Sequence, residues 1–239
     1  MTLPDIGRLF AWSDWAALVW FFAVWIGYAT FARRRAQADG SLLATTNRYR
    51  KRWAMQATSR ENRVIDGVVM QHLGAAPSFF ASTTILIIGG LLAVLGTSEK
   101  ATDLVREIPF VARTSVLVFD LKLLLLTSIF IYAFFRFTWS LRQYTFGALL
   151  IASMPDATVF ERGEASREEH ASRAGRVVGL AAETFNDGLR AYYFAFAAVL
   201  WFFSPIAFAV GAALVVTVLY LREFKSDVLA VMRESSSDP

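Results

Sequence analysis

Four long apolar stretches constrain the fold of this chain more than any other feature. They cover residues 15–32, 77–97, 116–135 and 193–221. A helix rises about 1.5 Å per residue, so a helix of about 20 apolar residues crosses the hydrocarbon core of a bilayer. The sequence therefore predicts an all-α integral membrane protein built as a bundle of four transmembrane helices.

The composition is typical of one compact membrane domain over residues 1–239. The chain is 56% hydrophobic, whereas soluble domains have roughly 45–50% apolar residues. No Ser/Gly/Pro-rich linker divides it. The chain has no cysteine and only two histidines, His72 and His170, which excludes disulfides, thiolate metal sites and cysteine nucleophiles. We expect no cofactor, no metal site and no catalytic residue.

Basic residues are distributed unevenly between the loops. The loops at 33–76 and 136–192 carry nine and seven, whereas the loop at 98–115 and the C-terminal tail carry three each and the N-terminal tail has only Arg8. By the positive-inside rule, both long loops are cytoplasmic and both termini lie outside. The basic tail fits this poorly, so a last segment that re-enters rather than crosses stays an alternative. Topology also accounts for the net charge of +4, and we expect no nucleic-acid partner.

Both long loops carry helical patterns that predict extensions into the cytoplasm. Ser166 and Glu169 have the spacing of a capping box, which predicts a helix that leads towards the last span. In the first loop, a near-helical apolar spacing accompanies a basic run. It predicts an amphipathic helix on the anionic lipids of the cytoplasmic leaflet, with a solvated helix as the alternative. The basic residues of this lipid surface are Arg48, Arg50, Lys51 and Arg52.

One acid–base pair, Asp120 and Lys122, lies inside an apolar stretch. Charged residues are costly there and are often functional. Both lie near the outer end of their span, where a lysine can extend its ammonium group to the interface. We expect the pair at the interface, and pairing with another helix or an ion path are the alternatives.

Polar residues gather where the last three spans meet the cytoplasmic helices. Arg63 precedes Asp66 by three residues and Glu183 precedes Asp187 by four, so each pair shares a helix face. A salt-bridge network, an anion-binding mouth based on arginine forks and an acid–base centre are three interpretations of this cluster. Its candidate residues, which we call the inner rim, are Arg60, Arg63, Asp66, Arg142, Glu183, Asn186, Asp187 and Arg190.

Four strings of residues near this rim resemble a family of multi-pass bacterial membrane proteins, a domain of unknown function. They are RxxRxxD at 60–66, FFAST at 79–83, FTWSLRQY at 137–144 and NxGLRAYY at 186–193. The resemblance covers most of the chain. It implies a bacterial inner-membrane protein, and it implies no activity, substrate or cofactor.

Small residues within the spans indicate close helix packing. Ser78, Ser82 and Gly90 are spaced by multiples of four, and Gly211 follows Ala207 by four. Such faces pack within one chain or between copies. Our leading hypothesis is a homo-oligomeric pore or small-solute pathway with an arginine-rich cytoplasmic rim. The alternative is a non-catalytic accessory or scaffold subunit of a membrane complex. An enzyme acting on lipid headgroups comes third, because no nucleophile or metal triad is evident.

Overall fold

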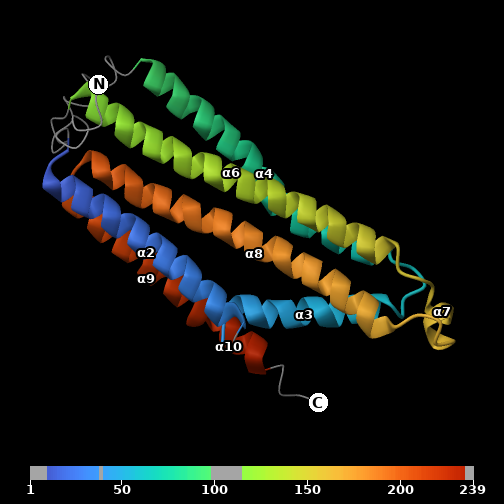
Figure 1. Cartoon of the computed structure of the whole chain (residues 1–239). Coiled ribbons are helices and arrows are strands. Elements are labelled where there is room, and N and C mark those ends of the chain that lie inside the picture. The colour runs from blue at the N-terminus through green and yellow to red at the C-terminus, as the bar shows by residue number, and fades with distance from the viewer. Residues whose placement is uncertain (1–9, 38–39, 98–114, 235–239) are drawn as a thin grey trace. The chain divides into compact units, whose positions relative to one another are not determined.

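The structure is a computed structural model that describes residues 10–37, 40–97 and 115–234, and these residues form helices without any strand (Figure 1). Four of the described helices are long and apolar enough to cross a membrane: α2 (Trp12–Gln37), α4 (Val64–Gly96), α6 (Val116–Ala152) and α9 (Pro205–Phe224). The predicted all-α membrane fold is confirmed. Arg8, Lys100, Arg106 and Arg113, which entered the charge count, lie outside the described residues.

The remaining elements connect or flank these four helices. They are α3 (Leu42–Ala57), α7 (Ala157–Glu161), α8 (Arg167–Val199), a short 3-10 helix η1 (Leu200–Phe202) and α10 (Asp227–Glu234). The chain forms two compact units. The apolar unit consists of Met1–Arg33, Thr83–Ala133 and Leu189–Arg222, and the charged unit consists of Arg34–Ser82, Phe134–Gly188 and Glu223–Pro239.

In the apolar unit, the last turns of α8 pack against every other helix. The Phe194 ring stacks on that of Trp25 of α2, with centroids 5.1 Å apart. Tyr192 shares a hydrogen bond of 2.6 Å with Thr84 of α4 and contacts the ring of Phe130 of α6. Since the last turns of α8 have helices on several sides, the buried Arg190 is shielded from lipid by protein.

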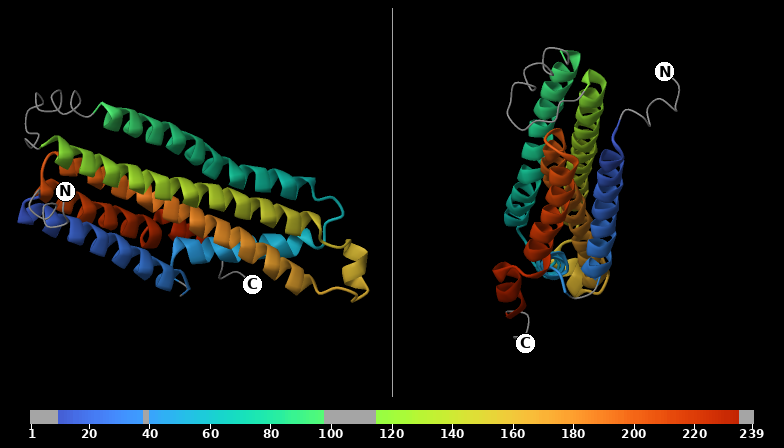
Figure 2. Two further views of the ribbon diagram at one scale, coloured as in Figure 1. Left: turned by 45° about the horizontal axis from the view of Figure 1, so that its top comes forward. Right: turned by 90° about the vertical axis from the view of Figure 1, so that its left-hand side faces the viewer.

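The helices α2 and α9 lie side by side and run in the same direction (Figures 1 and 2). Trp20 donates a hydrogen bond to the carbonyl of Ala209 at 3.2 Å. Further along both helices, the rings of Phe31 and Tyr220 lie 6.5 Å apart. The two helices therefore end at the same end of the apolar unit. A last span that crosses in the opposite direction to the first, as the charge count predicted, does not fit this arrangement.

The apolar stretch at 193–221 is two helical segments rather than one. The helix α8 ends at Val199 and α9 begins at Pro205. Ser204 accepts a hydrogen bond from the backbone N–H of Ala207 at 3.0 Å, as an N-cap does, and proline suits the first position of a helix because it needs no N–H partner. An added Cβ on Gly211 would lie 2.6 Å from Leu200 and 3.5 Å from Ala197, so the chain folds back on itself as a helical hairpin.

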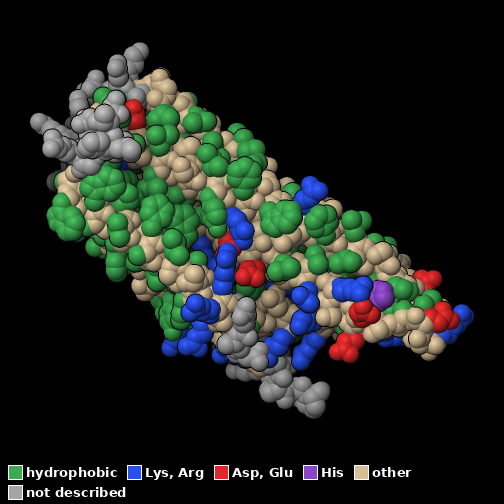
Figure 3. Space-filling view, in the orientation of Figure 1, with side chains coloured by type: hydrophobic (Ala, Val, Ile, Leu, Met, Phe, Trp, Pro, Cys, Tyr) green, Lys and Arg blue, Asp and Glu red, His purple; other side chains and the backbone are tan. Residues whose placement is uncertain are grey.

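In the charged unit, the first turns of α8 are again central. The backbone of α3 approaches α8 closely, since a Cβ added to Gly175 would lie 3.1 Å from Cα of Lys51. Ser140 of α6 donates to the carbonyl of Ala181 at 2.7 Å. On the face in Figure 3, charged side chains gather over α3, α7 and the start of α8.

The C-terminal residues belong to the charged unit. The helix α10 packs against α3, and the hydroxyl of Tyr49 donates to the carbonyl of Met232 at 3.1 Å. Tyr49 lies in the loop that the charge count predicted to be cytoplasmic. A cytoplasmic loop and an external C-terminus are therefore incompatible predictions.

Single-cysteine variants test the parallel course of α2 and α9. Because the chain has no cysteine, Ser13→Cys, Gln56→Cys and Lys225→Cys each introduce one thiol, and all three positions are exposed. We expect an impermeant maleimide to label Gln56→Cys and Lys225→Cys from the same side of the membrane, and Ser13→Cys from the other side. Labelling of Lys225→Cys together with Ser13→Cys would contradict the hairpin.

Glycine substitutions test the close packing around α8. A Cβ on Gly188 would lie 2.5 Å from the fully buried ring of Phe137, whereas a Cβ on Gly89 meets no atom within 4 Å. We expect Gly188→Ala to destabilise the protein by about 1–3 kcal/mol through overpacking. Gly89→Ala should be neutral or stabilising, because alanine favours helix more than glycine. Thermal unfolding in detergent, followed by circular dichroism, compares the two variants, and equal midpoints would contradict this packing.

Candidate functional site

The inner-rim residues are distributed over three places in the fold. Arg60 and Arg63 lie in the turn before α4, and Asp66 lies in its first turn. Arg142 lies on α6. The remaining four, from Glu183 to Arg190, lie on α8, where Glu183 and Asn186 are half-buried and Asp187 and Arg190 are buried.

Asp66 is the centre of the first polar group. Its side chain is fully buried. Its Oδ1 atom pairs with Arg60 and accepts a hydrogen bond of 2.7 Å from Nε1 of Trp53. Its Oδ2 atom has no hydrogen-bond partner among the described residues. The carboxylate therefore ties α3, the following turn and α4 together. Sequence reasoning paired Asp66 with Arg63 rather than Arg60, and it missed Trp53.

Arg63 binds backbone carbonyls instead of a carboxylate. Its Nε donates to the carbonyl of Ala57 at 3.3 Å, and its terminal nitrogens donate to the carbonyls of Met154, at 2.6 Å, and of Pro155. Ala57 is the last residue of α3, where a positive charge interacts favourably with the helix dipole. Arg63 thus fastens the end of α3 to the segment that follows α6.

A second ion pair joins α6 and α8 within the charged unit. Arg136 donates to the carboxylate of Asp187, whose side chain is 3% exposed. Arg136 is not one of the predicted inner-rim residues, yet it supplies the charge that compensates this buried acid. Asp66 and Asp187 therefore each have an arginine from a different segment, as a salt-bridge network requires.

Arg190 belongs to the apolar unit and is 4% exposed. Its guanidinium lies 5.8 Å from the ring centroid of Tyr28 of α2, a cation–π distance. Arg190 therefore fastens α8 to α2.

The basic residues of α3 point in different directions. Arg50 donates to Asn47 at 2.7 Å and to Thr46 at 3.0 Å, and burial lowers the pKa of its guanidinium below the usual value. Lys51 and Arg52 are exposed. The four predicted lipid-surface residues thus differ in exposure, since Arg48 and Arg50 are half-buried, and α3 packs against α8 near Asn47 and the Cα of Lys51.

A family comparison fits this arrangement of helices. The model of a family described as DUF599, proteins of unknown function, matches residues 16–228. The chain belongs to the DUF599 family. No curated protein and no solved structure matches the chain. The predicted membership of a family without assigned activity is confirmed, and the chemistry must be argued from the geometry.

In this DUF599 protein, Arg142 lies apart from the other inner-rim residues. It is exposed on α6, and its guanidinium lies 5.6 Å from the ring centroid of Phe146. No carboxylate lies within ion-pair distance of it in the described part of the chain. It lines a surface groove of about 480 Å³ together with Phe135, Thr138, Trp139, Leu141 and Thr145.

Lys122 is buried rather than extended to the interface. Its side chain donates from Nζ to the carbonyl of Trp201 at 2.8 Å and lies 5.2 Å from that indole ring. Trp201 in turn donates from Nε1 to Asp14 at 2.7 Å. Lys122 thus binds the turn between α8 and α9, which corresponds to the alternative of pairing with another helix. Asp120, its partner in the sequence, is half-buried.

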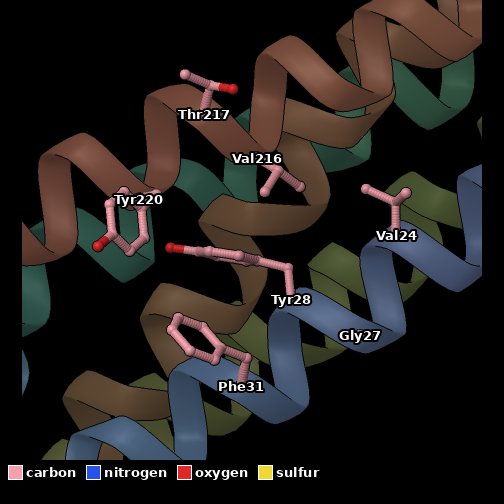
Figure 4. Close-up of a pocket in the computed structure, with 7 residues that line it drawn as sticks. All are labelled: Val24, Gly27, Tyr28, Phe31, Val216, Thr217 and Tyr220. Carbon is pink, nitrogen blue, oxygen red and sulfur yellow. The ribbon is translucent and has the colours of Figure 1, made fainter.

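A second groove, of about 390 Å³, lies between α2 and α9 in the apolar unit (Figure 4). The residues that line it are mainly aliphatic and aromatic, with hydroxyl groups on two tyrosines and one threonine: Val24, Gly27, Tyr28, Phe31, Val216, Thr217 and Tyr220. Thr217 offers the only aliphatic hydroxyl. Among the described residues, no group of three or more His, Asp or Glu side chains could hold a metal ion.

Substitution of Asp66 tests whether the first polar group is structural in this DUF599 protein. Asp66→Ala leaves Trp53 and Arg60 without their acceptor, and we expect a loss of about 1–3 kcal/mol of stability, the cost of an unpaired buried polar group. Glu168→Ala, on an exposed position of α8, is the control and should be neutral. The measurement is the midpoint of thermal unfolding in detergent. Equal midpoints for both variants would show that the Asp66 contacts contribute nothing to the fold.

Proposed function

We propose that this DUF599 protein is a non-catalytic accessory or scaffold protein of a larger membrane complex. The observation that carries the proposal is the engagement of both buried inner-rim acids. Asp66 is held by Arg60 and Trp53, and Asp187 is held by Arg136. Removing one member of a buried pair is costly, so these charges favour a role in fastening helices over a role in turnover.

The same proposal includes an orientation in the bacterial inner membrane. The parallel course of α2 and α9 favours an external N-terminus, a cytoplasmic C-terminus and five crossings, with the C-terminal half of α8 and η1 together as the fourth. Three basic residues near the C-terminus, Arg222, Lys225 and Arg233, then lie on the cytoplasmic side with nine of the first long loop and six of the second. This orientation satisfies the positive-inside rule better than two external termini.

The exposed surface of the charged unit supports a partner on the cytoplasmic side. Both signs of charge are present there, with Lys51 and Arg52 exposed on α3 and Glu168 and Arg176 exposed on α8. Complementary charges of this kind steer and orient protein association. The apolar unit, in contrast, exposes side chains such as Leu86 and Ile206, which suit lipid.

A homo-oligomeric pathway is the second candidate, and one observation favours it. Two charged residues of α8, Asp187 in the charged unit and Arg190 in the apolar unit, are both buried. Ionisable residues inside a membrane protein often mark an ion or solute route. Oligomer formation and flux are both needed for this alternative.

Site-specific photo-crosslinking in native membranes tests the scaffold proposal. A photo-reactive amino acid at Glu168 samples the charged unit, and one at the exposed Ile85 of α4 samples the apolar unit. We expect discrete crosslinked species containing a second, different protein from position 168, and none from position 85. Charge reversal at Arg176 should weaken the crosslink at 168.

Two results would count against the scaffold. One is a pattern of crosslinks to further copies of the chain alone, at both positions. The other is ion or solute flux through purified protein in liposomes above that of empty liposomes. Loss of this flux in Asp187→Asn, with an unchanged unfolding midpoint, would favour the pathway.

A further inference from the structure

Among the inner-rim arginines, Arg142 differs in its surroundings. Arg60 pairs with a carboxylate and Arg63 donates to three carbonyls. Arg142 is exposed and touches only the ring of Phe146 among the contacts of the described chain. A guanidinium offers five N–H donors in a planar fork that matches phosphate. Arg142 therefore presents a charge to the surroundings of α6 rather than to the bundle.

The groove beside Arg142 follows one face of α6. Thr138 and Trp139 follow Phe135 by three and four residues, Arg142 follows Trp139 by three, and Thr145 follows Arg142 by three. Its walls are mainly apolar. Thr138 donates to the carbonyls of Phe134 and Phe135 at 3.0 and 3.2 Å, and Thr145 donates to that of Leu141 at 3.2 Å. Because the hydroxyl protons are used within α6, the guanidinium of Arg142 and the indole N–H of Trp139 are the side-chain donors of this lining that are available to a ligand.

The position of this groove along α6 fits the headgroup level of a bilayer. The helix has 37 residues, and at about 1.5 Å per residue it is far longer than the roughly 30 Å of a hydrocarbon core. The apolar stretch ends near Phe135. Tryptophan is enriched at the membrane interface, and Trp139 lies one turn beyond Phe135. Arg142 follows almost one turn later, where phosphates of the cytoplasmic leaflet lie.

We propose that this groove is a binding site for an anionic phospholipid. The phosphate binds Arg142, the glycerol region lies against Trp139, and an acyl chain extends along Phe135. An inorganic anion would make no contact with the apolar walls of the groove, and a neutral apolar ligand would make no ion pair with Arg142. The site rests on the cytoplasmic orientation of the charged unit within the proposed function, but it needs no protein partner.

Lipid titration of the purified full-length protein tests this site by native mass spectrometry, with phosphatidylglycerol and phosphatidylcholine of the same acyl composition as probes. We expect the wild type to bind phosphatidylglycerol more tightly. Arg142→Gln should weaken this binding about tenfold, in line with a lost charge-assisted contact, and Arg142→Lys should retain part of it. Arg176→Gln is the matched control, since Arg176 is an exposed arginine of the same unit on α8, and it should bind like the wild type.

Two further measurements distinguish a lipid phosphate from free phosphate, and a contact with Trp139 from a contact with Arg142. Trp139→Leu should weaken both lipids, because it removes the interfacial contact, and excess inorganic phosphate should not displace phosphatidylglycerol. Equal losses in Arg142→Gln and Arg176→Gln would overturn the proposal in favour of diffuse electrostatic attraction. Displacement by inorganic phosphate would overturn it in favour of a free-anion site. Normal lipid binding together with absent crosslinks at position 168 would contradict the scaffold proposal and leave the lipid site standing.

Discussion

The structure depends on the enclosure of α8 by the other helices. Lipid supplies no hydrogen bonds, so polar groups in a membrane protein need protein partners. The helix α8 carries Asp187 and Arg190, which are stabilised by Arg136 of α6 and by the ring of Tyr28 of α2. The helix α8 has contacts on several sides in each unit. The polar contacts are therefore made towards α8, and the outer faces of the other helices carry apolar side chains. The fold is in this sense organised around its most polar long helix.

Close approach to α8 is made possible by glycines at the contacts. Gly175 admits the backbone of α3, and Gly188 admits the ring of Phe137. Without hydrophobic driving force in lipid, packing of this kind and interhelical hydrogen bonds hold helices together. The ion pair of Arg136 and Asp187 adds specificity, since it joins segments that are 51 residues apart in the sequence. The exposed Arg142 differs from Arg136 because no carboxylate among the described residues lies within ion-pair distance of it.

The sequence predicted the fold class correctly, and two of the acids that it singled out are buried in the structure. The lengths of the apolar runs predict α2, α4 and α6. The spacing of the charged residues placed Asp66 and Asp187 in the predicted inner rim. It did not reveal the partners, because Trp53 and Arg136 reach these acids through tertiary contacts. The break between α8 and α9 had a local signal in Ser204 and Pro205, an N-cap followed by proline. The continuous apolar run through this turn concealed that signal.

The sequence by itself determined that the chain is helical, that it is suited to a membrane and that it belongs to the DUF599 family, because these properties depend on composition, run length and local strings. The tertiary structure decided the direction of α9, the location of the C-terminal residues beside α3 and the division of the arginines into paired and exposed ones. The direction of a helix depends on which faces pack together. The hydropathy of a segment is the same whichever way the segment runs through the membrane, so it does not predict that direction. Likewise, an arginine has the same charge wherever it lies, and only its neighbours decide whether that charge fastens helices or faces a ligand.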